Sequence, residues 1–483
     1  MQTNFSAKQL QNPRLVEARD ILHRCVHCGL CNATCPTYVL SGDERESPRG
    51  RIYLIKSMLE SGRAPRAAQT RHIDSCLNCL SCVTTCPYGV DYKHLIDFAR
   101  GHVEEKGSRG PVERLTRQAF LMIMPEPSRL RQLLRYGRLV RPVSRFLRRI
   151  GLREVAAMLE LAPTGLLPSA SYGGPGVAAT KLDRRYRVAL LAGCTQQVMR
   201  PEITDATIRL LARRGVDVEV APGAGCCGSY ANALGRRSKT IQQAKVNVDA
   251  WMKLIGKDEL DAIIINGAGC GTTVKDYPQL LKQVPDYDWK ASQIAGMARD
   301  VTEFLDGFDL GPPKRWSSLR VAYHSSCSML HGQGIEKAPR ELLSKAGFAV
   351  VDVAEGHLCC GAADGYNLLH PQVADELRNR KADNIARAKA DVVACGDVAC
   401  ITQLAAGMET PVVHTVELLD WAYGGPVPRG LERLAELVND VPDSEPAHEK
   451  SIGLRLSLGG MGRQSSKSND EGATKPQKTS APV

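Results

Sequence analysis

The sequence predicts a mostly helical N-terminal domain followed by two copies of an α/β unit with parallel strands. Eight of the seventeen cysteines lie in two dense runs near the N-terminus. The later part of the chain repeats its cysteine pattern after about 130 residues, and segments typical of strands and helices alternate within each copy. With 483 residues the chain is too long for one compact core, so several domains are expected.

The cysteine content and the N-terminal segment restrict the class of protein. The first residues are polar and charged and contain no apolar signal core, so secretion is not expected. Cytosolic reductants keep thiols free, which makes disulfides a poor explanation for seventeen cysteines and favours metal binding. Apolar runs are far shorter than the ~20 residues that span a bilayer. We therefore expect a cytoplasmic protein, either free or peripheral on the cytoplasmic face of the inner membrane.

Residues 12–105 are expected to form the helical N-terminal domain. Between the two cysteine runs, Ser47 can cap a helix and Pro48 suits its first turn. The stretch RIYLIKSMLES then runs on to a glycine stop at Gly62. A helix is therefore expected to separate the two runs.

Residues 106–162 are expected to form an arginine-rich helical connector. From Pro127 to Arg153 the chain carries nine arginines and no acidic residue, interleaved with leucines at helical spacing and broken at Pro142. A solvated helical face or a subunit contact is the favoured interpretation, and docking to an anionic membrane surface is the alternative. Nucleic acid is not expected as a partner, because no recognition motif accompanies the patch. Residues 163–183, rich in glycine, proline and serine, are expected to form a linker.

Two α/β modules are expected over residues 184–315 and 316–430. Three cysteines of the first copy recur 133 positions later, and the fourth recurs 130 positions later. Strands and helices recur in the same order, as VALLAGC, ATIRLLARRG, VDVEV, IQQAKVNVDAWMKLI and DAIIINGAGC in the first copy, and as LRVAYHSSC, PRELLSKAG, AVVDVAEG, VADELRNRKADNIARAK and ADVVACGDVAC in the second. The tail at 442–483 lacks aromatic residues and is expected to be disordered.

The repeated cysteines form a candidate third metal centre, of iron and sulphur or of zinc. Each follows a predicted strand, and open parallel sheets bind ligands at the carboxyl ends of their strands, so one site per module or one shared site is expected. Burial as small apolar residues is the alternative, but packing alone hardly explains adjacent cysteines repeated in register. The candidate ligands are Cys194, Cys226, Cys227, Cys270, Cys327, Cys359, Cys360 and Cys400.

The two N-terminal runs, CVHCGLCNATCP and CLNCLSCVTTCP, share the pattern CxxCxxCxxxCP. Three closely spaced thiolates of one run can bind three irons of one cube, and in proteins with two clusters the fourth cysteine ligates the other cluster. Structural zinc sites also use CxxC pairs, but they usually bring two pairs from separated segments. Two 4Fe-4S clusters are therefore expected, the first with Cys25, Cys28, Cys31 and Cys86 and the second with Cys76, Cys79, Cys82 and Cys35.

Two resemblances to known modules follow from these motifs. The long interval between Cys35 and Cys76 makes the N-terminal domain resemble the α-helical ferredoxins of respiratory dehydrogenases. The spacing of a cysteine, an adjacent pair ending in CCG and a later cysteine makes each α/β unit resemble the CCG cysteine-rich module. Heterodisulfide reductase subunits use paired copies of this module to hold an unusual iron–sulphur centre, but they tend to end it with CxxC. The endings here, NGAGCG and CGDVACI, lack CxxC and are interpreted as contributing one final cysteine each to the module's pattern.

The string GAGCCG at 223–228 also satisfies the dinucleotide-binding pattern GxGxxG. Cysteines occupy its variable positions, the second copy replaces its glycines with EGHLCCG, and no acidic strand end follows at the required distance. A dinucleotide site is therefore rejected. The glycines are interpreted as permitting the tight turn that presents the adjacent thiols.

Four further stretches resemble the iron–sulphur subunits of bacterial glycolate oxidase, also called glycolate dehydrogenase: SPRGRIYLIK, HSSCSMLHGQ, EGHLCCGAADGYNLLHP and ITQLAAGMETPVVHTVELLDWAYGG. The resemblance runs from about Asn12 to Gly425. This sequence departs from it at Ser326, where the family favours proline, in CGDVAC, where TGNIGC is more usual, and in the long tail. His324 and His331 are interpreted as loop histidines or as residues that support a metal site.

The resemblance implies an electron-transfer subunit that is not active alone. Flavoprotein dehydrogenase subunits would remove two electrons from glycolate to give glyoxylate, and this chain would pass them singly to a quinone or other acceptor. No catalytic residue is assigned, because no flavin or substrate pocket is recognisable in the sequence. The alternatives are an equivalent subunit of a lactate or glycerol 3-phosphate dehydrogenase, a thiol-disulfide enzyme similar to heterodisulfide reductase, and a zinc-stabilised interaction protein.

Overall fold

The computed structural model describes residues 1–151, 156, 175–315 and 317–439. Met1–Glu436 form one compact unit, and a second unit begins at Leu437. The predicted tail at 442–483 lies outside the described residues, as does residue 316 at the start of the second predicted module. The predicted domain bounds stay predictions.

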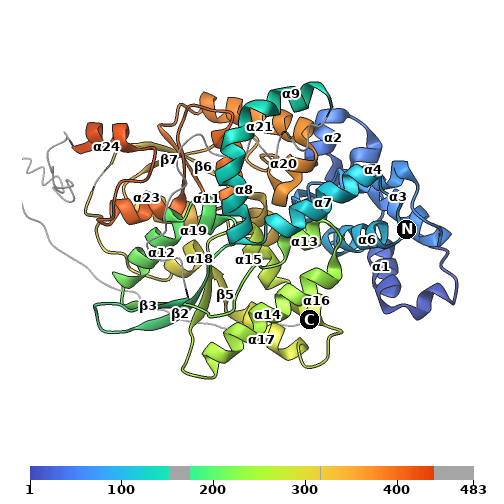
Figure 1. The fold of residues 1–483 in the computed structure, drawn as a ribbon, viewed down its shortest axis with the longest axis horizontal. Coiled ribbons are helices and arrows are strands. Elements are labelled where there is room, and N and C mark those ends of the chain that lie inside the picture. The colour runs from blue at the N-terminus through green and yellow to red at the C-terminus, as the bar shows by residue number, and fades with distance from the viewer. Residues whose placement is uncertain (152–155, 157–174, 316, 440–483) are drawn as a thin grey trace, which may run out of the picture. The chain divides into compact units, whose positions relative to one another are not determined.

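The N-terminal domain is helical, as predicted (Figure 1). Ser47 Oγ accepts a hydrogen bond from the Gly50 N–H at 2.9 Å, which caps the helix between the two cysteine runs. That helix ends at Gly62, whose φ of 61° lies in the left-handed region. The helices of this domain are α1 (Pro13–Arg24), α2 (Pro36–Ser41), α3 (Pro48–Ser61), α4 (Ala67–Asp74), α5 (Ser81–Thr85) and α6 (Tyr92–Lys106), with short 3-10 turns at η1 (Gln9–Gln11), η2 (Leu30–Asn32) and η3 (Glu44–Glu46).

The described residues of the connector form the helices α7 (Pro111–Ile123), α8 (Pro127–Val140) and α9 (Ser144–Arg149). The predicted break at Pro142 is confirmed, because a 3-10 turn, η4 (Arg141–Val143), separates α8 from α9. Phe120 of α7 and Leu134 of α8 pack with Val198 and Leu368, so the connector contacts both modules through one buried cluster. The later part of the connector lies largely outside the described residues.

The first module contains a five-stranded sheet in the order β1-β3-β2-β4-β5. The last four strands are parallel, as predicted, and β1 pairs antiparallel with β3. Since β1 covers Gly176–Ala178, part of the predicted linker is instead an edge strand; its partner lies about 40 residues away, beyond the reach of a local pattern. The elements are β1, β2 (Tyr186–Leu191), α11 (Gln196–Met199), α12 (Glu202–Ala212), β3 (Val216–Val220), α13 (Ser229–Ala233), α14 (Arg237–Ile255), β4 (Ala262–Ile265), α15 (Ala268–Lys275), α16 (Tyr277–Leu281), α17 (Asp288–Met297), β5 (Ala298–Asp300) and α18 (Val301–Leu305).

The second module contains a four-stranded parallel sheet in the order β7-β6-β8-β9. This order repeats the β3-β2-β4-β5 part of the first sheet, which confirms two related α/β units. The elements are β6 (Arg320–His324), η5 (Ser328–Gly332), α19 (Lys337–Lys345), β7 (Ala349–Val351), η6 (Ala363–Gly365), α20 (Tyr366–Leu369), α21 (Pro371–Arg387), β8 (Val392–Cys395), α22 (Val398–Ala405), β9 (Val412–His414), α23 (Thr415–Ala422) and α24 (Glu432–Asn439).

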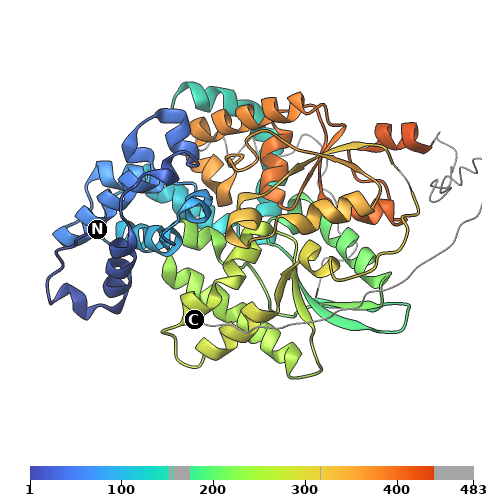
Figure 2. The same cartoon turned by 180° about the vertical axis from the view of Figure 1, so that it is seen from behind.

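The two modules lie side by side, as the reverse view shows (Figure 2). Arg209 of α12 and Arg213, which directly follows α12, both form ion pairs with the buried carboxylate of Asp420 in α23, each at 2.6 Å. His414 Nε2 lies 3.0 Å from the Asn266 carbonyl oxygen of the other module. These contacts hold the two sheets in a fixed relation, so residues at their strand ends have defined neighbours.

None of the helices in the described part of the chain combines the length and apolar character needed to cross a membrane.

Candidate metal centres

The two N-terminal cysteine runs share the same backbone conformation. His27 and Gly29 in the first run have φ of 60° and 83°, and the matching positions Asn78 and Leu80 in the second run have φ of 53° and 64°. Residues in the left-handed conformation between the cysteines turn each loop so that it curves around one point. Non-glycine residues adopt this conformation only at a cost in conformational energy. A Cβ at Gly29 would lie 2.5 Å from the Arg49 side chain. Both loops are therefore shaped to present three thiols inward.

The first pocket between these loops has an exposed rim. Burial raises the pKa of Cys31 to about 11, so without a metal this thiol stays protonated. Cys28 is exposed, and beside it Val26 and Leu30 are 53% and 56% exposed. The structure brings the predicted first set together in this pocket, which is lined by Cys25, Cys28, Cys31 and Cys86, with Cys82 at its edge.

The second pocket is enclosed. It is lined by the predicted second set, Cys35, Cys76, Cys79 and Cys82. All four side chains are buried, and burial raises the pKa of the Cys79 and Cys82 thiols well above the usual range. Cys82 lines both pockets, so the two sites are adjacent.

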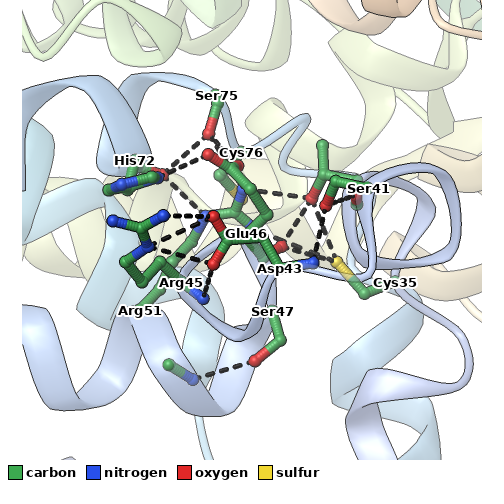
Figure 3. Close-up of polar contacts among 12 residues, drawn as sticks. Cys35, Ser41, Asp43, Arg45, Glu46, Ser47, Arg51, His72, Ser75 and Cys76 are labelled. Carbon is green, nitrogen blue, oxygen red and sulfur yellow. Dashed lines mark hydrogen bonds and ion pairs between the residues drawn. The ribbon is translucent and has the colours of Figure 1, made fainter.

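A buried arginine lies against the second pocket (Figure 3). Arg51 is 1% exposed, and its Nη1 lies 3.8 Å from Cys35 Sγ. Its Nη2 forms an ion pair with Glu46 at 2.6 Å, and its Nε donates to the His72 carbonyl oxygen at 2.7 Å. Glu46 also bonds His72 Nδ1 at 2.5 Å and accepts from Ser75 Oγ. These contacts fix the guanidinium of Arg51 beside Cys35. Arg51 also interacts electrostatically with Cys76, so its positive charge lies near two of the thiols.

Polar hydrogens also point at the sulphur of Cys76. The Asn78 N–H donates to Cys76 Sγ at 3.4 Å, and the Tyr92 hydroxyl donates to it at 3.9 Å. Arg100 donates to the Cys76 carbonyl oxygen. Hydrogen bonds to cluster sulphurs favour the reduced, more negative state of a cluster. The second pocket is therefore equipped for tuning a redox centre.

The second module packs against the N-terminal domain beside Cys79. Cys79 lies in one buried cluster with Cys359, and Cys327 packs against the same cluster. The Tyr366 hydroxyl donates to the Ser75 carbonyl oxygen at 3.1 Å, which joins the module to α4. His331, which the sequence left as a loop or supporting histidine, bonds Thr84 Oγ1 through Nδ1 at 2.8 Å and so serves the same interface.

The thiols of the first module converge at the carboxyl edge of its sheet. Hydrogen bonds from Cys194 and Cys227 lower the pKa of Cys226 below its usual value. Cys270 follows β4 by five residues and lies in the first turn of α15. The pocket over these thiols also contains Asp364 and Asp397 of the second module, and burial raises the pKa of both carboxyls.

The thiols of the second module form two close pairs. Cys327 Sγ lies 3.8 Å from Cys359 Sγ, and Cys360 Sγ lies 3.3 Å from Cys400 Sγ. Hydrogen bonds from Cys359 and Cys400 lower the pKa of Cys360. Cys400 follows β8 by five residues and lies in α22.

Sequence reasoning missed Cys395, which ends β8 and interacts with Cys400. The motif CGDVAC contains both cysteines, and the predicted sets include sixteen of the seventeen cysteines, so a full count would have drawn attention to Cys395. His324 ends the neighbouring strand β6, and burial lowers its pKa to about 3, so its imidazole is neutral. Its ligand atom, Cys360 Sγ and Cys400 Sγ lie within 4.8 Å of one another.

The distances between ligand atoms distinguish two kinds of site, one suited to a single ion and one suited to a polynuclear cluster. Among the described residues, only His324, Cys360 and Cys400 bring three ligand atoms of this type within 4.8 Å of one another. The thiols of the N-terminal runs are spaced more widely around their pockets, which suits a polynuclear cluster whose ligands bind different iron atoms. The chemistry of four thiols in a largely apolar pocket fits iron–sulphur clusters in the N-terminal domain.

Comparisons with known proteins agree with this geometry. Residues 24–90 match the 4Fe-4S dicluster domain, and residues 188–275 and 321–405 match the cysteine-rich domain named CCG. The chain is similar over 242 residues, 48% of its length and 96% of the relative's, to Lactate utilization protein A of Oceanobacillus iheyensis, at 27% identity. A crystal structure of a hypothetical protein from Helicobacter pylori covers 87% of this chain and is itself covered to 74%, with a TM-score of 0.50 and 10% identity, which shows likeness of fold alone.

Similarity to one relative extends over nearly the whole molecule. The Glycolate oxidase iron-sulfur subunit of Escherichia coli is 37% identical over 422 residues, which are 87% of this chain and 99% of that protein. The chain belongs to the family of glycolate oxidase iron–sulphur subunits.

Proposed function

We propose that this protein is the iron–sulphur electron-transfer subunit of a flavin-linked glycolate dehydrogenase. The observation that carries the proposal is the continuous order of cysteine sites: an exposed pocket, an adjacent enclosed pocket, and the thiols of the second module packed against Cys79. Such an order provides a route for electrons from a partner at the surface into the molecule. The name of the Escherichia coli relative supports glycolate as the substrate of the assembly.

We assign the ligands of two 4Fe-4S clusters by the crossed pattern. Support comes from the pockets, since Cys86 of the second run lies with the first loop and Cys35 of the first run lies with the second loop. When bound, each cluster carries one electron at a time. Arg51 and the donors to Cys76 would make the second site easier to reduce, because they stabilise added negative charge.

The substrate chemistry belongs to partner subunits in this proposal. A flavoprotein subunit oxidises glycolate to glyoxylate and releases two electrons and two protons, and the chain described here takes the electrons singly. The exposed rim of the first pocket, with Val26 and Leu30 beside Cys28, is where the flavoprotein docks. Exposed apolar side chains next to a redox centre suit a protein partner because docking excludes water there.

The arginine-rich helices supply a membrane-facing surface, and a quinone is the proposed acceptor. Tyr136, Leu139, Val143, Phe146 and Ile150 are all exposed, although each is large and apolar. They follow one another at intervals of three and four residues across α8, η4 and α9, ending just after α9, and nine arginines accompany them in sequence. We refer to these five side chains as the exposed apolar stripe of α8 and α9. A basic amphipathic surface of this kind binds anionic lipid, which would hold the protein peripherally at the cytoplasmic face of the membrane.

The CCG modules are proposed to hold additional metal, as iron–sulphur or zinc. Thiols packed this closely repel one another as thiolates unless a metal neutralises them. Within each module the described thiols contact one another, which favours one site per module over a single shared site.

The experiment uses the full chain and the flavoprotein subunits, each purified anaerobically. The chain alone should reduce no dye with glycolate, the flavoprotein with glycolate should reduce its clusters, and a quinone should reoxidise them. Substantial glycolate oxidation by the isolated chain, or clusters that the flavoprotein cannot reduce, contradicts the relay function.

Lactate is the second candidate substrate, favoured by the similarity to Lactate utilization protein A. The same assembly distinguishes the two, because the preferred substrate is the one with the larger kcat/KM.

A further inference from the structure

We propose that the second module holds a single zinc ion through His324, Cys360 and Cys400, with Cys395 as the fourth ligand. This inference rests on the part of the proposed function that gives the CCG thiols a metal, and it names the metal and adds two ligands, His324 and Cys395. Both lie outside the set of repeated cysteines.

The separation of the ligand atoms fits one ion. The ligand atoms of His324, Cys360 and Cys400 all lie within 4.8 Å of one another, and the two sulphurs are 3.3 Å apart. In a tetrahedral zinc site, bonds of about 2.3 Å to sulphur and about 2.0 Å to nitrogen place neighbouring ligand atoms about 3.3 to 3.8 Å apart. Small movements of the three side chains are therefore enough to bring their ligand atoms to bonding distance from one central zinc ion.

His324 is a buried side chain whose ring nitrogen Nε2 is available to bind a metal. The residue is 3% exposed, and its Nε2 is buried without a hydrogen-bond partner. An unpaired buried polar atom carries the cost of its lost hydration, which a bond to zinc would remove.

The two modules provide an internal comparison. In the second sheet His324 of β6 pairs in register with Cys395 of β8, and in the first sheet the equivalent pair is Leu191 and Ile265. Both pairs stand at the carboxyl ends of the two central strands, beside the CCG cysteines. The second module thus has two ligating side chains at the positions where the first has two apolar ones, so only the second can hold this ion.

Cys395 is placed to complete the tetrahedron. Its backbone stands one strand spacing, about 4.8 Å, from that of His324. Its thiol interacts with Cys400 and lies 3.4 Å from Ser326 Oγ. Cys395 Sγ is not part of the group of atoms within 4.8 Å, so binding requires its side chain to turn toward the ion. Such a rotation is local because Cys395 lies at a strand end.

A buried cation balances the charge of the site. Three thiolates, one neutral imidazole and Zn²⁺ carry a net charge of −1. Lys381 of α21 is buried, donates to the Glu355 carbonyl oxygen at 2.6 Å, and interacts electrostatically with Cys360. Its ammonium supplies the compensating positive charge. The pair Cys327 and Cys359 remains free to face Cys79.

The test measures zinc and iron in the full chain purified anaerobically. Wild type should contain about one zinc per chain, and zinc-edge X-ray absorption should show one nitrogen at about 2.0 Å and sulphur at about 2.3 Å. His324→Leu, which installs the residue of the first module, and Cys400→Ser should lose the zinc. Cys270→Ser, the matched change in the first module, should keep it.

Iron and folding separate this inference from the proposed function. His324→Leu should retain the iron of the two N-terminal clusters, and electron transfer from the flavoprotein is measured independently. Iron-loaded wild type without zinc, zinc with only sulphur neighbours, or full zinc in His324→Leu overturns the inference. If His324→Leu fails to fold, the zinc-edge X-ray absorption of wild type tests the inference, because it shows whether a nitrogen atom is bound to the zinc. Missing iron or a missing relay with zinc present contradicts the proposed function alone.

Discussion

Cys79 of the second cysteine run packs against Cys359 of the second CCG module, although 280 residues separate them in sequence. The two thiols lie in one buried cluster and interact electrostatically. A redox centre bound through Cys79 would therefore be in direct contact with the thiols of the second module. The N-terminal domain and that module act as one electron-transfer unit in this arrangement.

Replacing Cys35 should remove the second cluster rather than the first. In Cys35→Ser, the loss of a ligand from the enclosed pocket should lower the iron content by about four atoms if the cluster does not survive. Electron paramagnetic resonance of the reduced protein measures which signal disappears. Cys86→Ser is the matched control and should remove the other signal. Cys28→Ser, in the first loop, identifies the signal of the first cluster. Loss of that signal in Cys35→Ser would show that the ligands are not crossed.

Arg51→Gln should make the second cluster harder to reduce. Removing a buried positive charge 3.8 Å from Cys35 Sγ destabilises the reduced state, and we expect a fall in potential on the order of 60 mV, tenfold in the one-electron equilibrium. Redox titration measures the reduction potential of the second cluster. Arg51→Lys, which keeps the charge, should shift the potential less. An unchanged potential in Arg51→Gln with intact clusters would remove the tuning role.

The contact of the N-terminal domain with the first module should weaken as pH rises. Burial alone would lower the pKa of His94, but its hydrogen bonds to Asp276 and Asp91 raise it to about 10. The folded pKa exceeds the unfolded value of about 6.5, so the stabilisation is complete below that value and is lost as pH approaches 10. Hydrogen exchange of α6 between pH 6 and 10 should show this loss.

His94→Asn should remove most of that pH dependence, because it lacks the titrating ring. His23→Asn, in which the lost ring bonds Thr3 within the same domain, serves as the control and should keep the wild-type profile. A profile in His94→Asn as steep as that of wild type would assign the dependence to other groups.

Leu30→Glu should weaken docking of the flavoprotein. Leu30 is exposed beside Cys28, and burying a carboxylate at a protein interface should lower the second-order rate of cluster reduction about tenfold or more. Stopped-flow reduction by the glycolate-reduced flavoprotein measures this rate, and reduction by dithionite should be unchanged. Leu115→Glu, at a comparably exposed leucine of α7, should behave as wild type. Equal rates in both variants would place the docking surface elsewhere.

The double variant Leu139→Glu and Phe146→Glu should lose membrane binding. These side chains lie in the exposed apolar stripe of α8 and α9, and each contributes roughly 1.5 to 3 kcal/mol when buried in lipid. Sedimentation with phosphatidylglycerol vesicles should show at least tenfold weaker binding, whereas Trp289→Glu should bind normally. Binding of wild type to neutral phosphatidylcholine vesicles should be weak. No binding of wild type to anionic vesicles would argue for a subunit contact instead.

Local sequence patterns determined the elements whose causes are local. The spacing of the cysteine runs predicted two looped thiol sets, and both loops place left-handed residues at matching positions. Ser47 and Gly62 predicted the ends of α3, because a cap acts within one helical turn. The repeat predicted two parallel α/β units, since each copy carries its own alternation of strands and helices.

Tertiary packing decided the contacts that join distant segments. The edge strand β1, the approach of Arg51 to Cys35 and Cys76, and the pairing of His324 with Cys395 all depend on the register of strands and the docking of helices. No spacing pattern records such contacts, because the partner lies tens of residues away and any of several packings would satisfy the local sequence. The sequence by itself therefore predicted sets of candidate ligand thiols, and only the fold placed the charges and the added histidine beside them.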